Sequence, residues 1–170
     1  MTAMQSEREL TIRPATRLDL AEILSLVAAV DLPPDGIEQY LGGFLVARDE
    51  QGNLLGTIGM ERHRQLGLLR SAAVSPGLQR SGLGTMLASR LIADATAAGI
   101  SEILLLTSTA RVFFEKRFGF SIAFREQYDS VMSGSPEWSL PRCSSAVLMR
   151  LKLTHGTESM RPSLAKARPD

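Results

Sequence analysis

A glycine-rich turn between a strand and a helix constrains this 170-residue chain more than any other feature. The apolar run 66–74 predicts a buried strand, residues 75–77 end it, and a long amphipathic helix is predicted to begin at Leu83. The start of a helix presents unpaired backbone N–H groups and about half a positive charge. Because Gly82 and Gly84 lack a Cβ, an anion can approach this backbone closely. The pattern therefore predicts a cradle for a phosphate or pyrophosphate.

Two other phosphate-binding motifs do not fit the turn. A Walker loop needs Lys and then Ser or Thr after its second glycine, whereas Gly82 is followed by Leu83 and Gly84. A dinucleotide fingerprint that starts at Gly82 needs a third glycine at the position of Leu87. The turn can also be interpreted as a helix entry without a ligand. Strand end, proline, basic Arg80, paired glycines and helix occur in order, however, and this order favours the ligand.

The rest of the chain predicts a mixed sheet with helices on its faces. Short apolar runs and alternation predict strands, and helical spacing of apolar residues predicts helices. The predicted strands are residues 10–13, 44–47, 54–61, 66–74, 103–106, 122–124 and 146–153. The predicted helices are residues 19–29, 37–41, 83–98 and 110–117. The order β-α-α-β-β-β-α-β-α-β-β is typical of an α/β or α+β fold.

Length and composition predict one soluble, cytoplasmic domain, since a domain holds about 150 residues. Nineteen Lys and Arg face eighteen Asp and Glu, and a net charge of +1 argues against a nucleic-acid partner. The single Cys143 excludes a CxxC zinc site, and we expect no metal. No apolar run reaches the roughly 20 residues that span a bilayer, so we expect no membrane partner. We expect a folded domain over residues 10–153, a flexible N-terminus (1–9) and a disordered tail (154–170).

The glycine-rich turn resembles the coenzyme-binding signature of the GNAT family of N-acetyltransferases. The segment Val74-x-Pro76, followed by Gln79-Arg80-Ser81-Gly82-Leu83-Gly84, is similar to the family's Q/R-x-x-G-x-G/A pattern. A second segment, Ala110-x-x-Phe113-Phe114-Glu115-Lys116 and then Phe118-Gly119-Phe120, is similar to N-x-x-A-x-x-L-Y-E-K-x-G-F. Thr107 and Phe114 stand where the family usually has asparagine and tyrosine, and one extra residue separates Phe114 from Gly119. The family's frequent tyrosine general acid is therefore missing at its expected place.

The resemblance implies a mixed, mostly antiparallel sheet that splays open between two central parallel strands, with acetyl-CoA bound along the splay. It places backbone N–H groups of Ala73 and Val74 where they polarise the thioester carbonyl. The implied coenzyme-binding residues are Ala73, Val74, Gln79, Arg80, Ser81, Gly82, Leu83, Gly84, Thr85, Thr109, Phe113 and Phe114. Many members of the family dimerise, so a homodimer is a further expectation.

Four segments are similar to arsenic-resistance N-acetyltransferases and to the acetyltransferase domain of N-acetylglutamate synthases. They are Gly59-Met60-Glu61, Leu68 to Val74, Leu105 to Ala110 and Cys143 to Met149. The resemblance implies a small, amino acid-like amine as the acetyl acceptor, with an arsenic-bearing compound as one option. A protein N-terminus or lysine is an alternative acceptor. A non-catalytic acyl-CoA-binding module is the third interpretation, because the usual tyrosine is missing.

Candidate groups for proton transfer are few. Glu61, at the end of an apolar run, is the predicted general base, acting directly or through water, because the amine must be neutral before it attacks. The alternative is a solvated charge that pairs with Arg62 or Arg64. Tyr128 is the predicted general acid. The thiolate can also leave unassisted, since its pKa is modest.

Substrate-binding residues are expected on two buried strands. Arg70 lies within an apolar run, where an arginine is costly without an anionic partner. It is predicted to hold a substrate carboxylate, and the alternative is a structural pair with an acid such as Glu61 or Glu102.

Thr107 and Ser108 end the next strand, at the edge where substrates of the family sit, and are predicted to bind substrate. The alternative for this segment is helix capping, with Ser108 or Thr109 as the N-cap before Ala110.

Overall fold

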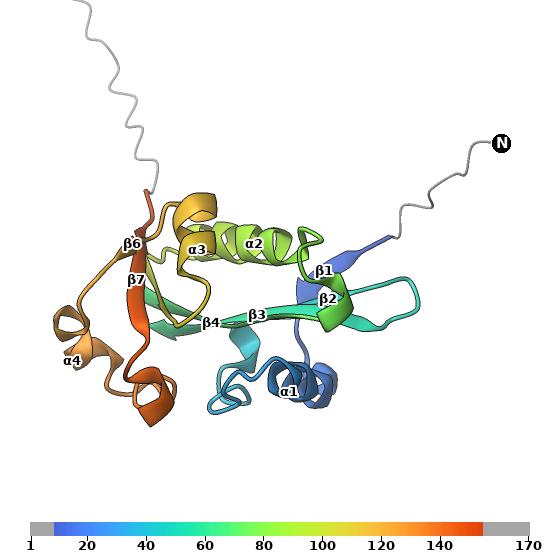
Figure 1. Ribbon diagram of the computed structural model, residues 1–170, viewed down its shortest axis with the longest axis horizontal. Helices are drawn as coiled ribbons and strands as arrows, with labels where there is room; N and C mark the ends of the chain where they lie inside the picture. The colour runs from blue at the N-terminus through green and yellow to red at the C-terminus, as the bar shows by residue number, and fades with distance from the viewer. Residues whose placement is uncertain (1–8, 155–170) are drawn as a thin grey trace, which may run out of the picture.

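A seven-stranded sheet forms the centre of the computed structural model, which describes residues 9–154 (Figure 1). The strand order is β1-β2-β3-β4-β5-β7-β6. The pair β4–β5 is parallel, and the other neighbouring strands described are antiparallel. The expected mixed, mostly antiparallel fold is therefore confirmed. The predicted flexible N-terminus and disordered tail lie outside the described residues, apart from Glu9 and Thr154.

Most elements begin and end close to their predicted positions. The strands are β1 (Thr11–Pro14), β2 (Phe44–Arg48), β3 (Leu54–His63), β4 (Leu66–Val74), β5 (Glu102–Thr107), β6 (Ser121–Ile122) and β7 (Val147–Lys152). The α-helices are α1 (Leu20–Ala29), α2 (Leu83–Ala97), α3 (Arg111–Phe118) and α4 (Asp129–Met132). The helix expected over 37–41 is wrong, because turns and the 3-10 helix η2 (Leu41–Gly43) occupy this region. The stretch between Gly36 and Gly42 is too short to offset the cost of helix nucleation.

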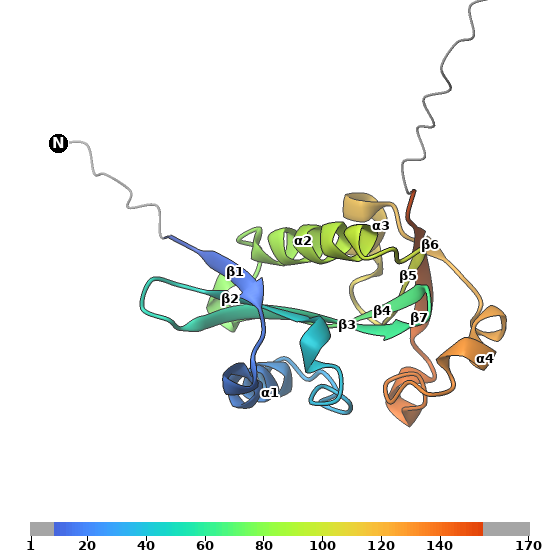
Figure 2. The same cartoon turned by 180° about the vertical axis from the view of Figure 1, so that it is seen from behind.

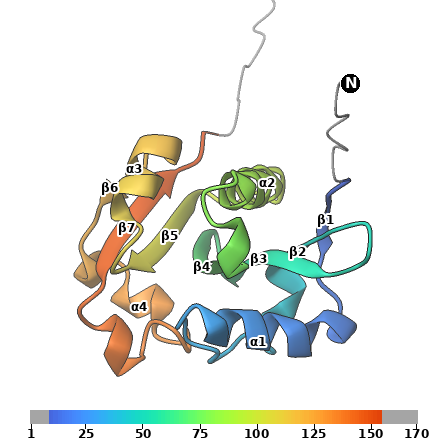
Figure 3. The ribbon, with the colours of Figure 1, turned by 45° about the vertical axis from the view of Figure 1, so that its right-hand side comes forward.

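The helices cover the two faces of the sheet. On one face, called here the α2 face, Leu83, Leu87, Leu91 and Ala95 of α2 pack with sheet residues such as Leu69 and Leu105, and α3 lies beside them (Figure 3). On the opposite face, the α1 face, α1 packs against Val46 and Ala73, and α4 lies over Leu68 and Leu104 (Figure 2). Side chains of successive strand residues point to opposite faces, so β4 contributes to both cores.

The central parallel strands separate part-way along their length. Pairing between β4 and β5 ends at Leu69↔Leu105. Beyond that point β4 carries a bulge, because Gly59 pairs with Arg70 while Thr57 pairs with Ala73. Ser71 in the bulge adopts a left-handed φ of 54°. A bulge bends its strand and re-aims backbone groups, which accounts for the expected splay.

No helix within residues 9–154 is long and apolar enough to cross a membrane. The expected homodimer stays a prediction.

Candidate active site

The glycine-rich turn presents free backbone amides at the start of α2. Gly82 is the N-cap of α2 with a φ of 89°, and Arg80 before it has a φ of 65°. The N–H of Met86 bonds to the carbonyl of Gly82 at 3.1 Å. The three amides before it, of residues 83–85, have no acceptor within the helix. No side chain caps this helix start either, so these amides are open to an anion.

A cavity of about 150 Å³ adjoins this turn on the α2 face of the splay. Its lining comes from β3, the bulged part of β4, α2 and α3, and comprises Thr57, Ile58, Ala72, Ala73, Val74, Gly84, Leu87, Ala88, Ala110, Phe113 and Phe114. The structure thus brings together five residues predicted to bind the coenzyme, Ala73, Val74, Gly84, Phe113 and Phe114. The others, Gln79, Arg80, Ser81, Gly82, Leu83 and Thr85, lie on the adjoining turn and first helical turn, and Thr109 lies on the turn before α3.

The turn and the cavity suit the two chemical parts of acetyl-CoA. The diphosphate needs N–H donors and positive potential, which the start of α2 supplies. The pantetheine arm is slender and largely apolar. Apart from its chain neighbours and the backbone of its own helix, a Cβ added at Gly84 would have one neighbour within 4 Å among the described residues, the Cγ2 of Val74 at 3.9 Å. This open space beside Gly84 lets a ligand approach the backbone.

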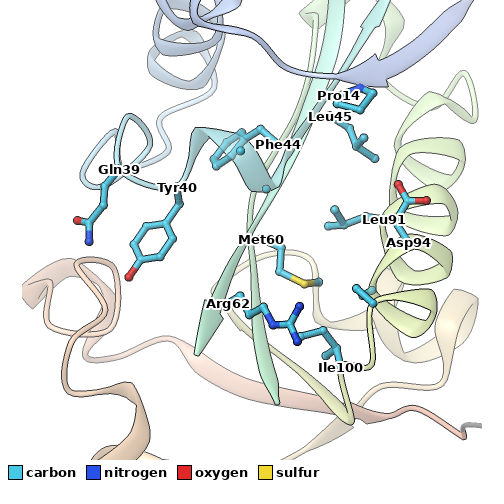
Figure 4. Close-up of a pocket in the computed structure, with 14 residues that line it drawn as sticks. Pro14, Gln39, Tyr40, Phe44, Leu45, Met60, Arg62, Leu91, Asp94 and Ile100 are labelled. Carbon is cyan, nitrogen blue, oxygen red and sulfur yellow. The ribbon is translucent and has the colours of Figure 1, made fainter. Parts of the chain in front are cut away.

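A wider cavity of about 500 Å³ lies elsewhere on the α2 side. It is bordered by η2, the C-terminal end of β3 and the second half of α2. Figure 4 shows Tyr40 and Arg62 on one side of it and Leu91 and Asp94 of α2 on the other. None of the residues predicted to bind the coenzyme lines it. The residues predicted to bind the coenzyme therefore lie around the splay cavity and the adjoining turn, away from this wider cavity.

Thr107, the last residue of β5, caps the turn that leads into α3. Its Oγ1 accepts hydrogen bonds from the backbone N–H groups of Ala110 (2.8 Å) and Thr109 (3.3 Å). The prediction that Ser108 or Thr109 provides the cap is therefore wrong. Both are exposed, whereas Thr107 is buried and points back toward the amides.

Removal of this cap has a measurable cost. We expect Thr107→Val, which keeps the shape of the side chain, to lower the free energy of unfolding by about 1 kcal/mol. Thr109→Val serves as the matched control and is expected to change stability little. Urea denaturation of both variants provides the measurement, and equal stabilities would contradict the capping role of Thr107.

A buried ion pair occupies the α1 face at the splay. The side chains of Arg70 and Glu61 are both 0% exposed, and Nη1 of Arg70 donates to Oε1 of Glu61 at 2.6 Å. Arg70 also donates from Nη2 to the carbonyl of Pro33 (3.2 Å) and from Nε to Oγ of Ser71 (3.1 Å). The solvated pairing of Glu61 with Arg62 or Arg64 is therefore wrong, and the alternative pairing of Arg70 with Glu61 is present.

The second oxygen of Glu61 joins this pair to a distant loop. Oε2 accepts a hydrogen bond from Oγ of Ser135 at 2.6 Å and lies 3.0 Å from Nε2 of His63. Oγ of Ser135 in turn accepts from the backbone N–H of Trp138 at 3.1 Å. The loop after α4 is thereby fixed over the sheet.

Glu137, between Ser135 and Trp138 in the same loop, was not predicted from the sequence to lie beside this ion pair. Its side chain is 8% exposed, and its Oε2 lies 3.3 Å from Nε of Arg70. Oε2 nevertheless has no hydrogen-bond partner among the described residues, because that N–H is directed at Ser71. Burial raises the pKa of Glu137 to about 7, although Arg70 acts in the opposite direction. The one indication in the sequence is an acid beside a tryptophan in an otherwise polar loop.

Tyr128 lies away from the splay. Its hydroxyl accepts a hydrogen bond from Nη1 of Arg150 at 3.3 Å, and Arg150 also faces Glu102, the first residue of β5. The splay opens toward Thr107, at the other end of β5, about 16 Å farther along a strand of this length. Burial raises the pKa of Tyr128. The structure therefore does not bring this predicted general acid to the predicted coenzyme site.

Comparison with known proteins identifies the family. Residues 16–120 match the family model described as Acetyltransferase (GNAT) family. The chain belongs to the GNAT family. No curated protein matches the chain.

Solved structures share the GNAT fold with this chain. N-acetylglutamate synthase from Neisseria gonorrhoeae, complexed with coenzyme A and N-acetyl-glutamate, is similar with a TM-score of 0.70 and 21% identity over 88% of this chain and 36% of that one. Rv2747 from Mycobacterium tuberculosis, in complex with CoA and NLQ, is similar with a TM-score of 0.68 and 21% identity, over 85% of this chain and 99% of that one. The ribosomal-protein-S18-alanine N-acetyltransferase from Escherichia coli is similar with a TM-score of 0.66 and 20% identity, over 89% of this chain and 99% of that one. The chain spans about a third of the length of the synthase, and these low identities show the fold alone.

Proposed function

We propose that this GNAT enzyme transfers the acetyl group of acetyl-CoA to the α-amine of a small, amino acid-like molecule. Because the fold is shared with enzymes named for different acceptors, the acceptor is inferred from the site itself. The observation that carries the proposal is the closure of the α1 face at the splay.

Two loops meet over the buried ion pair on this face. Arg70 and Arg142 link the loop of residues 31–40 to the loop of residues 133–143. Arg70 binds the carbonyl of Pro33. Nη2 of Arg142 donates to the carbonyl of Asp31 at 2.8 Å. Gly36, with a φ of 80°, packs so closely on Pro136 that an added Cβ would lie 2.7 Å from its Cγ. An extended peptide needs an open trough for its backbone. A face closed in this way favours a small acceptor.

The acid–base requirement of the reaction favours an α-amine. The nitrogen must lose its proton before it attacks. A free α-amine has a pKa of about 8 and a lysine side chain about 10.4, so the lysine costs roughly 3 kcal/mol more to neutralise at pH 7. An amino acid-like acceptor therefore makes the lighter demand on the site.

The coenzyme side of the proposal relies on main-chain groups. The amides of residues 83–85 would bind the diphosphate, with Arg80 adding positive charge, and Phe113 and Phe114 would flank the pantetheine arm. Backbone N–H groups of Ala73 and Val74 would stabilise the negative charge that develops on the carbonyl oxygen. Bound acetyl-CoA supplies an activated acyl thioester. Arg70 is assigned to organising the buried acids, since its guanidinium is already occupied by protein partners.

A thiol-release assay with acetyl-CoA and an acceptor panel tests this proposal. The panel contains the free amino acids, short peptides with free N-termini, and an arsenic-bearing amino acid analogue, included because of the sequence resemblance. Turnover on free amino acids or the analogue is the expected result. Turnover on peptides alone would show a protein N-acetyltransferase, and tight coenzyme A binding without any turnover would show a binding module.

A further inference from the structure

We propose that Glu137 is the general base that removes a proton from the acceptor amine, and that Arg70 and Glu61 position it. The inference rests on the proposed function and names the residue that performs its proton transfer. It replaces Glu61, the base expected from the sequence.

Glu137 lies at the point where the strands separate. Arg70 is the first residue of β4 beyond the last β4–β5 pair, Leu69↔Leu105. Oε2 of Glu137 lies 3.3 Å from Nε of Arg70, on the α1 face. The coenzyme cavity opens from the same part of β4 on the α2 face, where Ala72 to Val74 line it. An amine beside Glu137 therefore meets the splay from the side opposite the coenzyme.

The loop that carries Glu137 is held on both sides. Ser135 donates to Glu61, and the backbone of Trp138 donates to Ser135. The indole Nε1 of Trp138 donates to Oδ1 of Asp129 at 2.9 Å, and the guanidinium of Arg125 lies 4.4 Å from the centre of the Trp138 ring. A carboxylate fixed in this way is preorganised for proton transfer.

Glu137 and Glu61 differ in their free acceptor capacity. Glu61 already contacts Arg70, Ser135 and His63, and its charge is neutralised by Arg70 at 2.6 Å. Oε2 of Glu137 has no hydrogen-bond partner among the described residues. A buried acceptor without a donor is costly and is usually paired in a folded protein. The N–H of an acceptor amine supplies the missing donor.

The charged and titratable neighbours of Glu137 favour a base that works near neutral pH. Burial is the largest influence and raises its pKa to about 7, the charge of Arg70 on β4 lowers it, and the charge of Glu61 on β3 raises it. Cys143 lies on the same side, and burial raises the pKa of its thiol, so that group stays neutral. His63 contacts the cluster through Glu61. Proton transfer from an α-amine of pKa about 8 is then unfavourable by about one pKa unit, against more than three for an ordinary glutamate.

Glu137 receives the first of the two protons that the acceptor nitrogen loses. An N–H bond of the acceptor ammonium breaks, and its proton forms an O–H bond with Oε2 of Glu137. The freed lone pair of the amine forms the C–N bond at the thioester carbonyl. The C–S bond breaks with its electron pair on sulfur, which takes the second proton lost by the nitrogen. Glu137 then returns its proton to water.

Glu137→Gln in the full-length enzyme tests the inference. The neutral amide resembles the protonated carboxyl group, so the variant is expected to fold, and its melting temperature checks this. With acetyl-CoA and the best amino acid of the panel, we expect kcat to fall by about 10²–10⁴-fold, with the Kd for coenzyme A unchanged. The wild-type rate is expected to rise with pH until Glu137 ionises near pH 7 and then to level off. The variant is expected to show no such plateau there and to rise about tenfold per pH unit, as the free amine becomes more abundant.

Glu126→Gln is the matched control, because Glu126 is an exposed acid in the same connection between β6 and β7. It is expected to keep both the rate and the wild-type pH profile. A Glu137→Gln enzyme with wild-type kcat and an unchanged plateau would overturn the inference while leaving the proposed function intact. Wild-type enzyme that turns over no amine would instead refute the proposed function, and the inference with it.

Discussion

Replacing Arg70 with alanine is expected to lower the free energy of unfolding by about 3–5 kcal/mol. The guanidinium lies between the carboxylates of Glu61 and Glu137, and all three side chains are nearly or wholly buried. Without it, two acids remain in a region of low dielectric constant and lose the arginine that lies between them. The loop containing Pro33 also loses the hydrogen bond that Arg70 donates. Urea denaturation at pH 7 measures the effect.

Arg90→Ala provides the matched control. Arg90 pairs with Asp94 at 3.0 Å one helical turn away, and both side chains are more than 40% exposed. A pair of this kind contributes only a few tenths of a kcal/mol. A similar small loss for both variants would show that Arg70 is not the centre of a buried cluster, and would remove the support for Glu137 as a positioned base.

Gly84→Val is expected to weaken coenzyme A binding by about 100-fold without weakening the fold. Gly84 lies in the first turn of α2, where valine has a higher helix propensity than glycine. Its added side chain would extend into the open space of the splay cavity. The loss of two charge-assisted hydrogen bonds to the diphosphate, at about 1.5 kcal/mol each, corresponds to this 100-fold weaker binding. Isothermal titration calorimetry gives the Kd, and a thermal melt shows whether the fold is retained.

Gly77→Val is the matched control, which distinguishes a block of coenzyme A binding at Gly84 from a general disturbance of the turn. Gly77 precedes the same helix and has open space around its Cα. It lies outside both the free amides and the cavity lining, so its variant is expected to bind coenzyme A as the wild type does. If both variants bind normally, the diphosphate does not occupy the start of α2.

The elements that carry the proposed coenzyme site were predictable from local sequence. The strand at 66–74 was predicted with both ends correct, because a mostly apolar run is followed by Pro76 and Gly77. The helix from Leu83 was predicted to within one residue, since its apolar stripe indicates the buried face and Gly99 indicates where the helix ends. These features depend on short-range physical preferences, which a single sequence displays directly.

The proposed acceptor site was harder to predict because it depends on contacts between distant segments. Glu61 and Ser135 lie 74 residues apart in the sequence yet share a hydrogen bond. Neither periodicity nor spacing indicates that the loop around Glu137 folds back over β4. Tyr128 was selected for its chemistry alone, and only the three-dimensional structure places it beside Arg150.

The most direct test of the central claim is a titration of ¹⁵N-labelled protein with coenzyme A, followed by the backbone amide resonances. We predict the largest shifts at Leu83, Gly84 and Thr85, whose N–H groups would bind the diphosphate, and little change at Gly42 and Gly43 in the wider cavity. Shifts concentrated at Gly42 and Gly43, with Leu83 to Thr85 unmoved, would contradict the account.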